Sequence, residues 1–196
     1  MNNSATSKSD LKIKSFKSAD AFEKWLAKNH SKSPAIWLKF FKKNSGIKSV
    51  NYAQALDVAL CYGWIDALVR KFDESSYVQR FTPRRSRSMW SKRNRDHTKR
   101  LIKEGRMRPA GLEQIQAAKR DGRWKVAYES PRKMQIPSDF LQELARDPKA
   151  HAFFQTLDKR NLYAIAWRLN TAYKPAIREN RMKKILQMLA SGKKLH

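Results

Sequence analysis

The sequence predicts an α+β fold that is mostly helical, with a small antiparallel β-sheet in its N-terminal part and a helical C-terminal unit. Three observations lead to this prediction. The chain has 196 residues, 41% of them hydrophobic, which suits one domain or one domain with an appendage and suffices for a core. Aromatic and β-branched runs with strand-like patterns lie before residue 83. After Pro137 the apolar residues follow only the helical period.

The N-terminal elements follow from capping residues and periodicity. The segment LKIKSF alternates like a short strand, and a helix begins after Ser18. Residues 36–43 are aromatic and β-rich, which predicts a strand. A second helix starts at Asn51, because Gln54 lies three residues later, the spacing of a capping box. The segments WIDALVRKF, DESS and YVQRFT then predict a hairpin over residues 64–82.

The rest of the chain is predicted to be helical apart from one linker. A helix is expected from Ser88 to Glu104, closed by Gly105, and another in PAGLEQIQAAKRDG. The C-terminal helices are predicted in SDFLQELARD, PKAHAFFQTL, DKRNLYAIAWRLNTA and KPAIRENRMKKILQMLASG. The expected organisation is a disordered lead-in (residues 1–10), an α+β domain (11–123), a linker (124–137) and a helical unit (138–192).

The charge of the chain points to an anionic partner. It carries 43 Lys and Arg against 17 Asp and Glu, a formal net charge of +26. Such self-repulsion favours binding of polyanions, nucleic acid first and an anionic membrane surface second. Lysines are spread evenly, which equally fits a device for solubility. Arginine is different, because it gathers between Arg80 and Arg108 and offers a planar fork for phosphate or carboxylate.

Several classes of protein are disfavoured by what the sequence lacks. Cys61 is the only cysteine, so no disulfide framework or thiolate metal cage is expected, and it is predicted to be buried and inert. The four histidines are dispersed, and we expect neither a metal nor a cofactor. The N-terminus lacks the apolar region of a signal peptide, and no apolar run approaches the roughly 18 residues of a membrane span. A cytoplasmic protein is therefore expected.

The stretch FTPRRSRSMWSKRNRDHTKR, from Phe81 to Arg100, concentrates the arginines. On a helical wheel its second half has a packing side with Trp90 and a strongly basic opposite side. That basic side is either an ordinary solvated face or a surface that follows phosphates. The alternative nucleic-acid face consists of Arg93, Arg95, Lys99 and Arg100.

The first half of this stretch, RFTPRRSRS, is non-helical and lies just before the helix expected at Ser88. Arginines beside a helix N-terminus are suited to binding phosphate, sulfate or carboxylate. The predicted anion site consists of Trp64, Asp66, Arg80, Arg84, Arg85, Ser88, Trp90, Ser91 and Asn94. In it Arg84 and Arg85 clamp the anion, the serines present the helix N-terminus, and the tryptophans form the walls.

Two alternatives to this site remain open on the sequence. The arginines would instead be structural if they paired with Asp66, Asp73 or Glu74 of the hairpin, and the tryptophans would then be core residues. An enzyme acting on a small anion would need an acid–base pair, for which Asp66 and His97 are the candidates. Since no P-loop, G-x-G-x-x-G, H-E-x-x-H or G-x-S-x-G motif is present, a non-enzymatic role is the expectation.

Five motifs stand out in the central part of the chain: GWID, QRFTPRR, SMWSKRN, EGRMRPAG and AAKRDGRW. They resemble the YdeI/OmpD-associated family of bacteriocin-protection proteins, and the resemblance extends into the C-terminal helices and covers roughly residues 14 to 192. The family name implies a stress or antimicrobial-resistance role and association with an outer-membrane porin, and it leaves a periplasmic location open. The chain is therefore expected to be a basic, non-enzymatic protein that binds a small anion or phosphate-bearing ligand, with non-sequence-specific nucleic-acid binding as the alternative.

Overall fold

The computed structural model describes residues 13–195, so the predicted lead-in, residues 1–10, lies outside the described residues. Its elements are β1 (Ile13–Lys14), α1 (Ala19–Asn29), β2 (Ile36–Phe41), η1 (Lys43–Ser45), α2 (Tyr52–Cys61), β3 (Trp64–Lys71), β4 (Ser76–Pro83), α3 (Lys92–Lys103), α4 (Pro109–Arg120), α5 (Ser138–Ala145), α6 (Pro148–Gln155), α7 (Lys159–Asn170) and α8 (Pro175–Ala190). The α+β class predicted from the sequence is confirmed.

The chain divides into two compact units. The first contains the residues up to Ser88 together with His97–Ile115, and the second contains Met89–Asp96 together with the chain from Gln116 onward. Helices α3 and α4 therefore contribute residues to both. Between α4 and α5 the chain consists of turns and one isolated bridge, from Tyr128 to Ser91.

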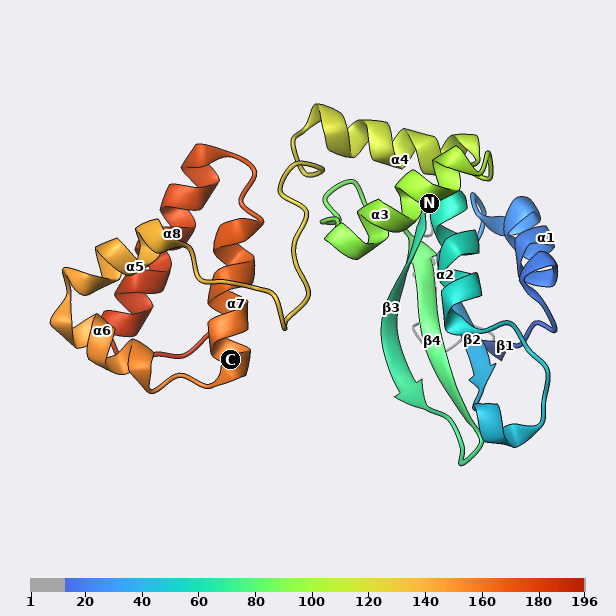
Figure 1. The fold of residues 1–196 in the computed structure, drawn as a ribbon, viewed down its shortest axis with the longest axis horizontal. Helices are drawn as coiled ribbons and strands as arrows, with labels where there is room; N and C mark the ends of the chain where they lie inside the picture. The colour runs from blue at the N-terminus through green and yellow to red at the C-terminus, as the bar shows by residue number, and fades with distance from the viewer. Residues whose placement is uncertain (1–12, 196) are drawn as a thin grey trace, which may run out of the picture. The chain divides into compact units, whose positions relative to one another are not determined.

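The first unit is built on a four-stranded sheet with the order β1-β2-β4-β3 (Figure 1). Strand β4 pairs antiparallel with both β2 and β3, as the predicted hairpin requires. Strand β1 pairs parallel with β2, so the sheet is mixed rather than wholly antiparallel. A register shift between Asp66 and Val69 interrupts the β3–β4 ladder, which bends β3 at that point.

The first two helices start where their capping residues predict. The Ser18 hydroxyl accepts a hydrogen bond from the Ala21 backbone N–H at 3.2 Å. Asn51 and Gln54 form a complete capping box at the start of α2, with each side chain accepting from the other residue's backbone N–H. Local hydrogen bonding, which the sequence displays directly, therefore sets both helix starts.

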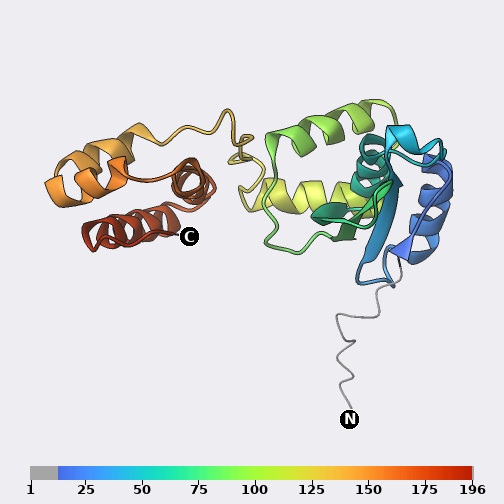
Figure 2. The same ribbon diagram turned by 90° about the horizontal axis from the view of Figure 1, so that it is seen from below.

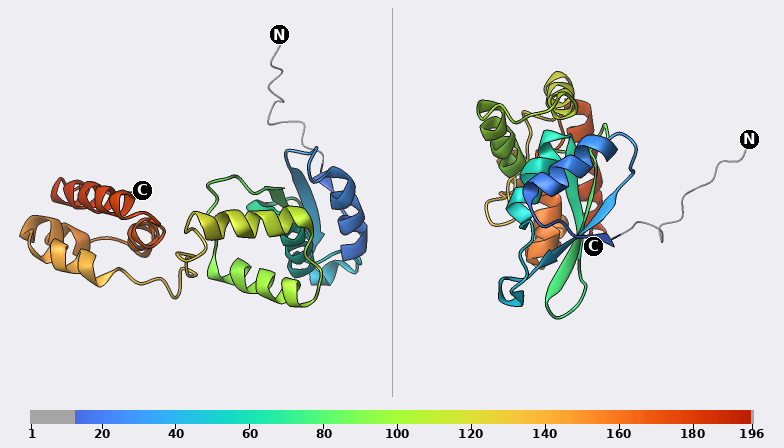
Figure 3. Two further views of the ribbon diagram at one scale, coloured as in Figure 1. Left: turned by 90° about the horizontal axis from the view of Figure 1, so that it is seen from above. Right: turned by 90° about the vertical axis from the view of Figure 1, so that its right-hand side faces the viewer.

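One face of the sheet carries the core of the first unit. The side chains of Ile36, Leu38 and Phe40 on β2 are at most 2% exposed, whereas the residues between them are half-buried. The Phe81 ring of β4 lies 6.4 Å from that of Phe40 and 6.0 Å from that of Phe22 on α1. Helices α1 and α2 cover this face, and the far end of the β3–β4 hairpin projects beyond them (Figure 3, right).

The second unit has its own apolar core among its C-terminal helices. In Figure 2 helix α8 (dark red) runs alongside α5 and α6, while α7 is seen end-on. The fully enclosed side chains of this core are Phe140, Leu144, Ala150, Leu157, Ile165, Leu169, Ile185 and Leu189. Asp147 and Asp158 cap α6 and α7, accepting from the backbone N–H groups of Ala150 and Asn161.

The start of α3 differs from the prediction. The helix begins at Lys92 rather than Ser88, and the Ser91 hydroxyl accepts the Asn94 backbone N–H at 3.1 Å, as a helix-capping serine does. Both Ser88 and Ser91 have capping chemistry, so the sequence offered two starts. Ser88 is instead used in a turn, where its hydroxyl accepts the Arg85 N–H.

Candidate functional site

A short arginine turn, residues Arg84–Ser88, follows β4. Its ends are tied together, because the Arg85 N–H donates to the Ser88 hydroxyl at 3.0 Å and the Ser88 N–H donates to the Arg85 carbonyl at 2.9 Å. The Arg84 N–H donates to the carbonyl of Gly63, which anchors the turn to the start of β3. Arg84 is only 6% exposed, whereas Arg85 and Arg87 are exposed.

The acidic residues of the hairpin are engaged by other partners than this turn. The Asp66 carboxylate accepts hydrogen bonds from the Tyr52 hydroxyl at 3.0 Å and from Gln79 Nε2 at 3.1 Å. Asp73 forms an ion pair with Lys39 at 3.2 Å, and Glu74 pairs with Lys71. In the described part of the chain, neither Arg85 nor Arg87 has a carboxylate partner.

Trp64 lies in the core of the first unit. Its side chain is 1% exposed, its Nε1–H donates to the His30 carbonyl at 3.0 Å, and it meets the Trp25 ring edge-on at 6.0 Å. Arg80, by contrast, lies on the strand face opposite to the core, where it pairs across the sheet with Trp37. Trp64 is therefore buried in the core, whereas Arg80 is half-buried on the opposite face of the sheet.

Three of the predicted site residues belong to the second unit. Trp90 is 2% exposed, and its ring lies 5.0 Å from that of Trp124 in an edge-on contact. Ser91 caps α3 through the Asn94 N–H, and Asn94 is itself 7% exposed. Within this unit, these residues complete a helix start and a buried aromatic contact.

Some residues of the alternative nucleic-acid face on α3 form hydrogen bonds within the protein. Arg95 donates through Nη1 to the Trp124 carbonyl at 3.2 Å. Arg100 donates to Asp57 at 2.5 Å and to Glu104 at 3.0 Å. Arg93 and Lys99 are exposed. Arg95 and Arg100 therefore form contacts within the protein.

The carboxylate beside His97 belongs to Asp57, whereas Asp66 is the candidate partner on the sequence alone. His97 Nδ1 lies 2.7 Å from Asp57 Oδ1, a distance that places the proton on Nδ1, because a carboxylate only accepts. Arg100 engages the other oxygen of the same carboxylate. Burial raises the pKa of Asp57, but the hydrogen bonds from His97 and Arg100 outweigh that effect and hold the pKa below its ordinary value.

We expect the Asp57→Asn variant to be less stable than the wild type at neutral pH by about 1–3 kcal/mol, since His97 and Arg100 lose a charged acceptor. The lowered pKa of Asp57 means that this contribution is present above the unfolded-state pKa and is lost as the pH falls through the folded-state pKa. Urea unfolding of both proteins at pH 7 and at a pH well below 3.8, the ordinary pKa of an Asp side chain, measures it. The difference should shrink in acid, and a difference that is independent of pH would show that the charge of Asp57 has no part in it.

Cys61 is placed as predicted, at the end of α2 and 3% exposed. Burial raises the pKa of its thiol to about 11, so it stays protonated at neutral pH. A protonated thiol is a poor nucleophile, and the residue acts as a core side chain.

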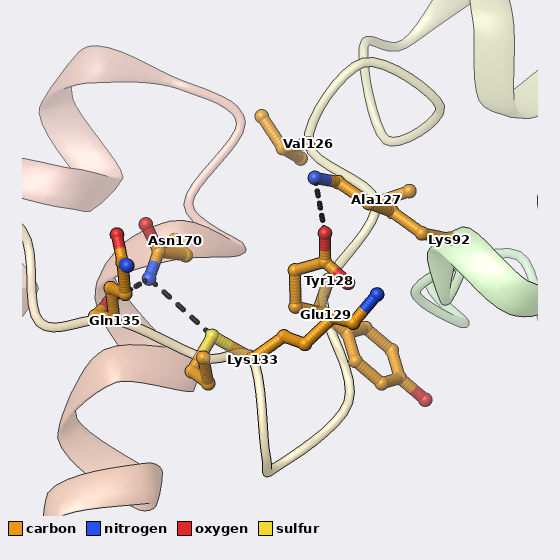
Figure 4. A pocket seen from close by; sticks show the side chains of 9 residues that line it. Lys92, Val126, Ala127, Tyr128, Glu129, Lys133, Gln135 and Asn170 are labelled. Atoms are coloured by element: carbon orange, nitrogen blue, oxygen red, sulfur yellow. Dashed lines mark hydrogen bonds and ion pairs between the residues drawn. The ribbon is translucent and has the colours of Figure 1, made fainter.

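The second unit contains a polar cavity of about 470 Å³ that no sequence pattern predicts (Figure 4). Lys92 Nζ forms an ion pair with Glu129 at 2.6 Å on one side. On another side of the cavity, Asn170 Nδ2 donates a hydrogen bond to the Gln135 carbonyl at 3.0 Å. The hydrogen bond from Lys92, together with the charges of Lys92 and Lys133, lowers the pKa of Glu129.

Asp57 and the residues that line the cavity were not predicted from the sequence, for two different reasons. Asp57 is the one acidic residue in the apolar run of α2, a signal that would have marked it as the partner of a basic group. Glu129, Lys133 and Gln135 lie in the aperiodic stretch after α4, where no pattern predicts which side chains converge.

Comparison with known families gives two matches, one after the other along the chain. Residues 14–114 match the family described as Domain of unknown function (DUF8412). Residues 133–192 match the family described as Bacteriocin-protection, YdeI or OmpD-Associated, which confirms the resemblance over that part of the chain. The motifs GWID, QRFTPRR, SMWSKRN and EGRMRPAG fall within the first match, and AAKRDGRW falls between the two.

No curated protein and no solved structure matches the chain. Among residues 13–195, no helix is both long enough and apolar enough to cross a membrane. The C-terminal helices match the YdeI/OmpD-associated family over residues 133–192. Since residues 14–114 make up more than half of the 196 residues, the chain belongs to the DUF8412 domain family.

Proposed function

We propose that this protein is a basic, non-enzymatic anion-binding protein that holds a phosphate-bearing ligand at the arginine turn. The proposal is supported by the exposure of two arginine side chains in that turn and by their lack of carboxylate partners in the described part of the chain. Arg85 and Arg87 are exposed, and no carboxylate among the described residues pairs with either. They are therefore available to an anion from solution.

The other arginines nearby provide the contrast. Arg100 pairs with Asp57 and Glu104, Arg106 with Glu104, and Arg108 with Glu23 at 2.7 Å. Arginines of this kind serve the fold, as the structural interpretation of the sequence requires. The turn differs from its surroundings because its exposed arginines lie outside such pairs.

Hydrogen bonds also hold the backbone that carries Arg85 and Arg87. Ser88 closes the turn through its hydroxyl and its backbone N–H, and Arg84 ties the turn to Gly63. A fixed backbone reduces the conformational entropy lost when two arginines converge on one ligand. Bidentate, charge-assisted hydrogen bonds from arginine are among the strongest that a protein forms with phosphate.

The family match of residues 133–192 supports a defence role for this binding. The name of that family includes bacteriocin protection, and we propose that anion binding serves a stress or antimicrobial-resistance function. A chain with a net charge of +26 repels a cationic peptide, so direct capture of such a peptide is disfavoured. An anionic partner is the electrostatically favoured route.

Replacing Arg85 and Arg87 together by alanine is expected to weaken binding of pyrophosphate at least tenfold, because charge-assisted hydrogen bonds from two guanidinium groups are lost. Isothermal titration calorimetry with inorganic phosphate and pyrophosphate measures the effect. The matched control is the double variant Lys43→Ala with Lys48→Ala, which removes the same charge from exposed positions in the same unit.

Comparison of the two double variants shows whether pyrophosphate binds at the arginine turn or responds only to the net charge of the protein. Thermal unfolding should be unchanged in both, because all four side chains are exposed. Equal weakening by the arginine and lysine variants would mean that the ligand responds only to net charge. Absence of pyrophosphate binding by the wild type would refute the proposal outright.

A further inference from the structure

Among the described residues, the sheet of the first unit has a second face that no helix of that unit covers. The core-side residues of β2 are Ile36, Leu38 and Phe40, so Trp37, Lys39 and Phe41 point the opposite way. Strand register extends this face across the sheet, because Trp37 is paired with Arg80, and Lys39 and Arg70 are both paired with Val78. We call it the open face: Trp37, Lys39, Phe41, Arg70, Phe72 and Arg80.

Side-chain contacts confirm that these residues share one surface. The guanidinium carbon of Arg70, on β3, lies 5.0 Å from the centre of the Trp37 ring on β2, so its side chain reaches across β4. Lys39 Nζ lies 5.0 Å from the centre of the Phe41 ring and 4.2 Å from that of Phe72. The open face is thus a layer of aromatic rings with cations resting on them.

The charges of the open face are unbalanced. Asp73 pairs with Lys39, but Arg70 and Arg80 have no carboxylate partner within the described part of the chain. Phe72 is 48% exposed, a large apolar ring at the surface. One exposed ring and two half-buried rings, Trp37 and Phe41, beside arginines without a carboxylate partner among residues 13–195 favour a ligand that has both flat apolar surfaces and negative charges.

We propose that the open face binds single-stranded nucleic acid, with bases stacking on Trp37 and Phe41 and with Arg70 and Arg80 contacting phosphates. Trp37 and Phe41 are four residues apart on one strand, about 13 Å, which leaves room for two or three bases. A base that stacks on Trp37 takes the place of the Arg70 guanidinium, which then turns to the phosphate. A duplex keeps its bases stacked on each other and cannot use the rings in this way.

This inference goes beyond the proposed function, because it concerns another surface and another ligand. The arginine turn has exposed arginines but no exposed ring, which suits a phosphate group alone. The open face adds aromatic planes, which suit bases. Variants of the two surfaces should therefore separate the two proposals.

The test is fluorescence anisotropy of labelled twelve-nucleotide oligo(dT) and oligo(U) titrated with the full chain. We expect the Trp37→Ala, Phe41→Ala double variant to raise Kd for the oligonucleotides about tenfold to a hundredfold, the range for loss of one or two stacked bases. Trp37→Phe, which keeps a ring, should stay within about threefold of the wild type. The Arg85→Ala, Arg87→Ala variant should also stay within about threefold.

Arg70→Gln provides a second variant that does not depend on the aromatic residues. Its side chain is exposed, so the fold should be retained, and it should weaken oligonucleotide binding and reduce its dependence on salt. No binding by the wild type at 50 mM salt would overturn the inference. Equal losses from the open-face and arginine-turn variants would also overturn it, as would tighter binding to phosphatidylserine vesicles than to the oligonucleotides.

Discussion

Replacing Gly111 by alanine is expected to destabilise the protein by about 3 kcal/mol or more, even though alanine is the better helix former. Gly111 lies in α4, where a Cβ atom would be 2.3 Å from the Cys61 carbonyl oxygen and 2.8 Å from that of Leu60. Both oxygens belong to the backbone at the end of α2 and cannot move aside like a flexible side chain. The alanine variant must therefore separate α4 from α2. Urea unfolding measures the loss.

Gly105→Ala is the matched control for that experiment. Gly105 has a φ of 68°, so alanine is strained there, but nothing lies within 4 Å of the added Cβ. Its cost should be about 1–2 kcal/mol, the penalty for placing a side chain in the left-handed region. If Gly111→Ala is stabilising, as an uncrowded helical glycine-to-alanine change would be, then α4 does not approach α2 as described.

Replacing Trp64 by alanine is expected to cost about 3–5 kcal/mol of unfolding free energy, because a fully buried aromatic side chain is deleted. The change leaves a cavity beside Trp25 and removes the hydrogen bond to the His30 carbonyl. Leu68→Ala on the same strand is the control, since Leu68 is 57% exposed and should cost less than about 0.5 kcal/mol. Chemical denaturation followed by circular dichroism gives both values.

This experiment also decides between two roles for Trp64. From the sequence Trp64 is predicted to form the wall of an anion pocket, whereas in the structure it is enclosed in the core. A Trp64→Ala protein that keeps its stability but loses pyrophosphate binding would restore the pocket role. Loss of stability as large as that expected assigns Trp64 to the core.

The elements that could be predicted from the sequence are those specified by neighbouring residues. Ser18 and Asn51 mark their helices because a cap and its partner N–H groups lie within three residues of each other. The β3–β4 hairpin follows from two strand-like runs around a short turn. The start of α3 could not be fixed in this way, because Ser88 and Ser91 offer equivalent local chemistry and only the fold uses Ser88 in the arginine turn.

Residues of the candidate site were harder to predict because their partners are distant in the sequence. His97 and Asp57 are 40 positions apart, so their spacing along the chain does not show that the two side chains meet. Likewise Arg70 reaches Trp37 only because β4 lies between β3 and β2 in the sheet. Burial then decided which arginines face solvent: Arg84 is enclosed and Arg85 is exposed, although they are adjacent.

The sequence by itself determined the α+β class, the helix caps of α1 and α2, the hairpin and the concentration of arginine between Arg80 and Arg108. Only the tertiary structure decided which of those arginines are paired with carboxylates and which are exposed. It also decided that one face of the sheet carries aromatic rings and cations instead of a core. The physical reason is that caps and turns depend on hydrogen bonds between neighbouring residues, whereas ion pairs and burial depend on contacts that only the folded chain creates.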